Sequence, residues 1–178
     1  LLLIKGSQES AFVNMIIVFI KVAIVLLFIV IGWQFINPAN HTPYLIPEGT
    51  APVTDSAGKV IADYSGWNKH GWGGILGGAG IVFFAFIGFD AVSTAAQEAK
   101  NPARDMPIGI LGSLVVCTVL YILFGHVLTG VAPYTDFTDP LKGQEASVAY
   151  AISAHMPGYG WLATLVTVAI LAGFSSVI

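Results

Sequence analysis

Two ionisable side chains lie in stretches that are otherwise strongly apolar. Lys21 is the one charged residue between Ile16 and Ile31, and Asp90 follows an apolar run that starts at Phe83. A charged side chain at the centre of a bilayer costs at least about 2.5 kcal/mol on insertion scales, and such residues often line transport paths. Both residues are therefore the first candidates for chemistry.

Lys21 has the deeper position of the two. It lies about ten residues, or roughly 15 Å of helix, from either end of the apolar segment that contains it. A lysine stem can reach only part of that distance to water. We expect an amine that takes part in proton coupling or replaces a bound cation, the alternative being a structural lysine tethered to a backbone carbonyl.

Asp90 follows Gly88 and Phe89. Glycine weakens a helix, and transporter helices are often broken near the bilayer midplane, where freed backbone groups hold the substrate or ion. With a break near Gly88, Asp90 could cap the second half-helix by accepting backbone N–H bonds. It could equally serve as a carboxylate in coupling or gating, and the two roles are compatible.

Four segments are long and apolar enough to position these residues in a bilayer, which needs about 20 apolar residues per helix. The first is rich in Ile and Val, which would suggest a strand in water, but in lipid the backbone must satisfy its own hydrogen bonds, which favours helix. We predict an all-α membrane protein with membrane helices over residues 11–36, 72–96, 108–131 and 157–178.

The connections between these segments carry the basic residues. Lys100 and Arg104 lie in the short turn 97–107, and Lys5 precedes the first helix, whereas Lys59 and Lys69 are spread through a long loop. Because basic residues in short loops stay in the cytoplasm, we predict a cytoplasmic turn at 97–107. The loops 37–71 and 132–156 are then outer loops, the second with a short helix around 146–155.

The composition supports a membrane protein and excludes several classes of function. Of the 178 residues, 56% are hydrophobic and 10% are charged, and the net charge of −3 indicates no nucleic-acid partner. The single cysteine, Cys117, can form neither an internal disulfide nor a metal site. We expect no cofactor, no enzyme activity and, because both termini interrupt apolar runs, a chain that is part of a longer protein.

Several other residues have predicted structural roles. The pairs Gly73/Gly77 and Gly74/Gly78 are spaced for close helix packing, and Trp67 and Trp72 are expected at the membrane interface. His126 is also expected to be interfacial. Asn40-His41-Thr42 resembles a glycosylation acceptor, although so short a motif has little specificity.

The stretch FFAFIGFDAVSTAAQEAKNPARDMPIGI, residues 83–110, resembles the sixth-helix signature of the cationic amino acid transporter subfamily, in the amino acid–polyamine–organocation superfamily. KGSQES at 5–10, followed by Asn14 and Lys21, is similar to the entry to that family's fifth helix. LTGVAPY at 128–134 is similar to the exit from its seventh. The resemblance covers most of the chain outside the loop 37–70.

This resemblance implies a LeuT-type fold of two inverted five-helix repeats, with the chain supplying helices five to eight. It implies secondary active transport of an amino acid by alternating access, with protons as the coupling ion. Lys21 would occupy the place of a sodium ion, and Asp90 would lie just beyond the broken helix. The backbone that would meet the substrate's ammonium group belongs to Phe84, Ala85, Phe86, Ile87 and Gly88.

The expected partners are the amino-acid substrate, the lipid bilayer and the remaining helices of the same protein. The chain differs from the family pattern at Gln97, where the family often has an acidic residue. The family's first helix, which would complete the substrate site, is not in the chain. An exchanger without proton coupling remains an alternative. An intramembrane aspartyl protease is a weaker one, because its Gly-x-Gly-Asp motif would need glycine where this chain has Phe89.

Overall fold

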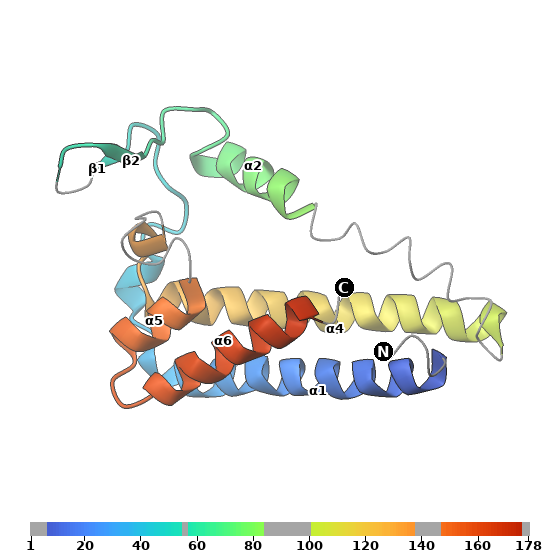
Figure 1. The fold of residues 1–178 in the computed structure, drawn as a ribbon. Coiled ribbons are helices and arrows are strands. Elements are labelled where there is room, and N and C mark those ends of the chain that lie inside the picture. The colour runs from blue at the N-terminus through green and yellow to red at the C-terminus, as the bar shows by residue number, and fades with distance from the viewer. Residues whose placement is uncertain (1–6, 55–56, 84–100, 138–146, 176–178) are drawn as a thin grey trace. The chain divides into compact units, whose positions relative to one another are not determined.

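The computed structural model describes residues 7–54, 57–83, 101–137 and 147–175 of the chain (Figure 1). These residues fall into two compact units, one formed by residues up to 41 together with those from 123 onward, the other by residues 42–122. Helix α4 contributes to both units. The described part of the chain is mainly helical, as the sequence predicts.

The first unit contains the long helix α1, Ser7–Gly32, which continues as the 3-10 turn η2, Trp33–Phe35. The 3-10 turn η3 spans Pro38–His41. Helix α1 thus begins four residues before the predicted boundary of 11, and its last predicted turn is 3-10 rather than α. The many β-branched residues of this segment form helix, because no partner strand is needed to satisfy a helical backbone.

The remaining elements of the first unit follow helix α4, Pro102–Val131. They are the 3-10 turn η6, Tyr134–Phe137, and the helices α5, Ser147–His155, and α6, Gly160–Ser175. Helix α5 is the short helix expected around 146–155. Helix α6 begins three residues after the predicted 157, because Gly158 has a left-handed φ of 88° that no right-handed helix contains.

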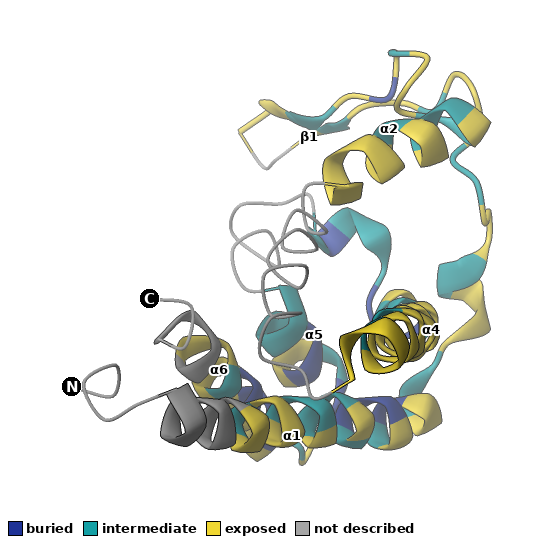
Figure 2. Ribbon diagram, turned by 90° about the vertical axis from the view of Figure 1, so that its right-hand side faces the viewer, coloured by how far each residue is buried: buried dark blue, intermediate teal, exposed yellow. Residues whose placement is uncertain are grey.

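The core of the first unit lies where these helices meet. Helix α6 packs against α1 and α5, and the ring of Phe28 on α1 lies 5.0 Å from that of Phe124 on α4. Figure 2 shows this buried end of α1 beside α5 and α6. Each fully buried apolar side chain contributes about 1.5–3 kcal/mol; the largest are Phe28, Val127, Ile152, Met156 and Leu162.

The second unit contains structure within the predicted outer loop. Strands β1, Val53–Thr54, and β2, Val60–Ala62, pair antiparallel, with Val53 opposite Ala62. They precede helix α2, Gly71–Phe83. Trp67 and Trp72, expected at the membrane interface, are both largely exposed, at 73% and 76%.

The predicted turn at 97–107 needs correction, because α4 is already helical from Pro102. The carbonyl oxygen of Asn101 accepts hydrogen bonds from the N–H groups of Arg104 (3.1 Å) and Asp105 (2.9 Å). Asparagine is a favourable N-cap and proline a favourable first helical residue. Pro102 therefore starts the helix, six residues before the predicted 108, and Pro107 lies inside it.

Candidate functional site

Lys21 lies near the middle of α1, within a segment, Met15–Phe35, that is long and apolar enough to cross a membrane. Its side chain is half-buried. Among the residues that the structure describes, no ion pair or hydrogen bond joins Lys21 to a partner. The structure thus places the amine in the apolar span, and shows no tether to a described carbonyl.

The other predicted site residues, Asp90 and the run Phe84, Ala85, Phe86, Ile87 and Gly88, lie outside the described residues. Helix α2 leads directly to them, since its last described residue is Phe83. Their roles stay predictions.

A polar cluster at the end of α4 was not expected from the sequence. The carbonyl oxygen of Gly130 accepts two hydrogen bonds, from the backbone N–H of Asn37 (3.0 Å) and from Nδ2 of Asn40 (2.8 Å). Asn40 is the residue of the glycosylation motif, and the atom that a glycan would modify is the one that donates here. This geometry favours a structural role for Asn40.

Two histidines extend this cluster. The rings of His41 and His126 stack with centroids 4.5 Å apart, and Trp33 lies 5.7 Å from His126. Nε2 of His41 lies 3.1 Å from the carbonyl oxygen of His126. A carbonyl oxygen only accepts, so the hydrogen is assigned to Nε2 of His41. His126, expected at the membrane interface, is half-buried in this contact.

A second polar contact joins η6 to the end of α5. Nε2 of His155 lies 3.0 Å from Oδ2 of Asp136, and Asp136 is buried. A buried carboxylate requires a hydrogen-bond donor, which His155 supplies. Sequence reasoning missed this pair, because the two residues are 19 positions apart and only the packing of α5 brings them together.

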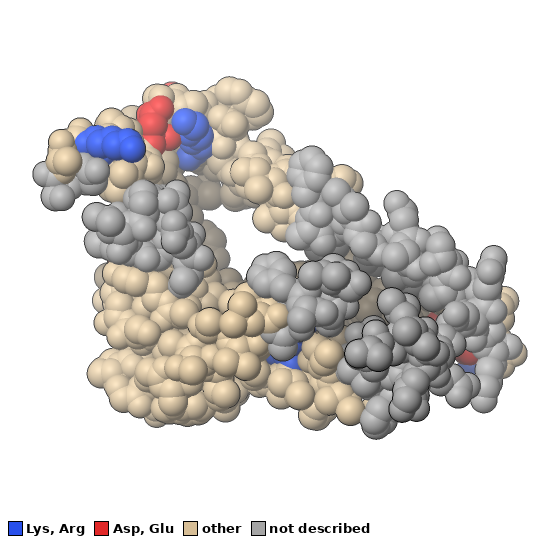
Figure 3. Space-filling view, viewed as in Figure 1, with Lys and Arg blue, Asp and Glu red and all other residues tan. Residues whose placement is uncertain are grey.

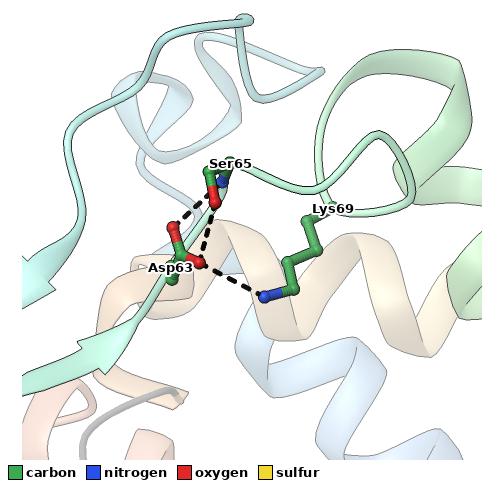
Figure 4. Close-up of polar contacts among 3 residues, drawn as sticks. All are labelled: Asp63, Ser65 and Lys69. Carbon is green, nitrogen blue, oxygen red and sulfur yellow. Dashed lines mark hydrogen bonds and ion pairs between the residues drawn. The ribbon is translucent and has the colours of Figure 1, made fainter.

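The second unit has a charged contact of its own (Figure 4). Asp63 accepts hydrogen bonds from the backbone N–H of Ser65 (3.0 Å) and its hydroxyl (2.8 Å), and lies 3.5 Å from Nζ of Lys69. These interactions, the backbone bond foremost, lower the pKa of Asp63 below its usual 3.8. In Figure 3 blue and red side chains lie next to one another at the hairpin end of this unit.

These contacts define what the described residues can do chemically. No three of their His, Cys, Asp or Glu side chains gather as a metal site would require. The two polar pairs of the first unit connect loops to helix ends, which is a structural role. Lys21 alone among the described charged residues lies deep in an apolar span.

Within the described chain, α1 with its 3-10 extension and α4 are the two helices whose length and composition suit a bilayer span, the pattern of an α-helical membrane protein. The sequence model of the amino acid permease family matches residues 1–178. The chain belongs to the amino acid permease family.

Relatives of the chain are named as permeases and transporters, two of the following three for amino acids. The branched-chain amino acid permease BcaP of Bacillus subtilis is 37% identical over 176 residues, which are 99% of this chain and 32% of that protein. The methylthioribose transporter of Bacillus subtilis is 39% identical over 140 residues, 78% of this chain and 25% of that protein. The chloroplastic cationic amino acid transporter 9 of Arabidopsis thaliana is 37% identical over 176 residues, 99% of this chain and 26% of that protein. The chain thus spans a quarter to a third of these relatives.

Proposed function

We propose that this chain is part of a transporter that carries an amino acid across the cell membrane by alternating access, coupled to protons. The support is the family match along the whole chain and the relatives named as amino acid permeases and transporters. The membership gives no support to the intramembrane protease alternative. In this proposal the chain supplies helices five to eight of a LeuT-type fold.

The backbone of residues 84–88 meets the ammonium group of the substrate, and Asp90 caps or gates the helix that follows. Lys21 acts where a sodium-coupled transporter would hold its cation. The observation that carries this assignment is the position of Lys21 inside the apolar span of α1. A charge in such a position is energetically costly, and charged residues found inside membrane spans usually have a function.

The test is uptake by the complete transporter, reconstituted in proteoliposomes with and without an inward proton gradient. The labelled panel contains branched-chain and cationic amino acids and, because of one relative's name, methylthioribose. Gradient-driven uptake of one amino-acid class supports the proposal. Uptake that requires internal amino acid and ignores the gradient supports the exchanger instead, and uptake of methylthioribose alone would refute amino-acid transport.

A substitution tests the role of Lys21. Lys21→Ala should lower gradient-driven uptake at least about tenfold, equivalent to 1.36 kcal/mol of barrier, while the protein stays folded. Lys59→Ala, which removes an exposed lysine of the hairpin region, is the matched control and should leave uptake unchanged. Proton-driven uptake at the normal rate in Lys21→Ala would rule out the coupling role.

A further inference from the structure

Residues 46–70 form a loop that is closed at its base. The N–H of Gly71, the first residue of α2, donates to the carbonyl oxygen of Ile46 (2.9 Å). Gly71 has a left-handed φ of 53°, which turns the chain from the loop into the helix. The hairpin β1–β2 lies between these two ends. Because of the hydrogen bond between Gly71 and Ile46, both ends of the loop lie at the start of α2.

The last part of this loop lies directly on α2. A Cβ at Gly73 would overlap the carbonyl oxygen of Trp67, and a Cβ at Gly77 would lie 2.5 Å from that of Asn68. Real Cβ atoms essentially never approach an atom so closely, and these are backbone atoms that cannot rotate away. Gly73 and Gly77 are four residues apart and so share one helix face, which we call the loop seat.

The closeness of the loop backbone differs from one glycine of α2 to the next, and a Cβ at Gly74 would lie 3.2 Å from the carbonyl carbon of Lys69. A Cβ at Gly78 or Gly80, on the same helix, would have no neighbour within 4 Å among the residues that the structure describes. The pair Gly73/Gly77, predicted from its spacing to pack against another helix, therefore receives the backbone of its own preceding loop. Glycine content alone does not explain the contact, because Gly78 and Gly80 belong to the same helix and do not make it.

The segment that rests on the seat is itself held in shape. The N–H of Lys69 donates to the carbonyl oxygen of Gly66 (2.9 Å), and Nζ of Lys69 approaches Asp63 at 3.5 Å. Asp63 in turn accepts both hydrogen bonds from Ser65. The residues from 63 to 69 thus form a compact turn that meets α2 as a fixed surface (Figure 4).

We propose that Gly73 and Gly77 are positioning residues that seat the backbone of Trp67 and Asn68 on α2, so that the loop 46–70 and α2 move as one body during transport. This inference rests on the proposed function. Alternating access requires helices to change their tilt, and conformational steps set the rate of many transport and catalytic cycles. A loop fixed at both ends and along the helix face would determine how α2 moves, without touching the substrate.

Four alanine substitutions on α2 test the seat. Gly73→Ala and Gly77→Ala place a methyl group against the loop backbone, whereas Gly78→Ala and Gly80→Ala place the same group where no described atom lies within 4 Å. All four remove a helix-interior glycine, so their effect on helix propensity is matched. The complete transporter is used in proteoliposomes, and two properties are measured per amount of folded protein: trypsin cleavage after Lys59 and Lys69, and the concentration dependence of uptake.

In the two seat variants we expect cleavage at least about tenfold faster and a maximal uptake rate at least about tenfold lower. The KM should change little, because the substitutions alter a conformational step and leave the substrate contacts in place. The two control variants should stay within about twofold of the unsubstituted protein in both properties. Should Gly73→Ala fail to fold, Gly77→Ala, whose added methyl group overlaps less, carries the test.

Each remaining outcome is distinct. Cleavage in the seat variants at the rate of the controls would refute the seat. Faster cleavage with unchanged uptake would show that the seat is structural and that loop and helix need not move together. Absence of amino-acid uptake in the unsubstituted protein would refute the proposed function and the one-body motion with it, while the cleavage result would still decide whether the seat exists.

Discussion

The contact between Asp136 and His155 is more buried than that between Asp63 and Lys69, with side chains 10% and 31% exposed. Asp136→Asn leaves the amide where the carboxylate was, and removes the charge that His155 faces. We expect a loss of about 1–3 kcal/mol of unfolding free energy, because one partner of a buried polar pair is left poorly satisfied. Thermal unfolding of the complete transporter in detergent measures it, with the exposed Glu48→Gln as control.

A double-mutant cycle separates this pair from general loss of packing. His155→Ala should destabilise the unsubstituted protein more than it destabilises Asp136→Asn, because the shared contact is lost only once. Additive effects would show that the 3.0 Å contact contributes nothing measurable to stability.

Asp63 offers a test by pH. Its pKa is lowered, chiefly by the backbone N–H of Ser65, so its contribution to stability is present above the usual carboxyl pKa and is lost as the pH falls through the lower, folded-state value. Asp63→Ala should therefore speed amide hydrogen exchange in residues 63–69 equally between about pH 5 and pH 8, where the carboxylate is fully ionised. Glu48→Gln, in the same loop, should not change it. An effect of Asp63→Ala that varied across this pH range would contradict the assignment.

Among the elements, the end of α4 is held by the segment that follows α1. Asn40→Ala removes the Nδ2 donor to Gly130 and should lower the unfolding free energy by about 0.5–1.5 kcal/mol. Thr42→Ala removes the glycosylation motif while keeping that amide, and is the matched comparison. Equal losses of stability in the two variants, with a change in glycan mass, would show that Asn40 acts through glycosylation instead.

The elements also show what a sequence can predict. Hydropathy alone locates α1 and α4, because twenty apolar residues in lipid have few alternatives to helix. The hairpin at 53–62, the seat at Gly73 and Gly77, and the Asp136–His155 contact depend on which distant residues meet, and no local period encodes that. The family resemblance adds the expected site at 84–88 and Asp90, but neither periodicity nor the described residues test it.

For the molecule as a whole, α4 is the longest helix of the described chain and a candidate membrane span. It contains 30 residues, about 45 Å at 1.5 Å per residue, whereas the hydrocarbon core is about 30 Å thick. The helix is therefore long enough to cross with a turn or more to spare. Its first turn carries Arg104 and Asp105, which lie most favourably outside the hydrocarbon.

The distribution of basic residues predicts which end of α4 faces the cytoplasm. Lys100 and Arg104 lie close to its start, and Lys59 and Lys69 lie in the longer loop before α2, so the start of α4 should be inside. With native cysteines such as Cys117 replaced, Ala57→Cys should react with a membrane-impermeant maleimide in intact cells, and Ala103→Cys only after permeabilisation. Both positions are exposed, so access depends on the membrane. The reverse pattern would invert the orientation, and labelling of both in intact cells would contradict the membrane helix predicted between them at residues 72–96.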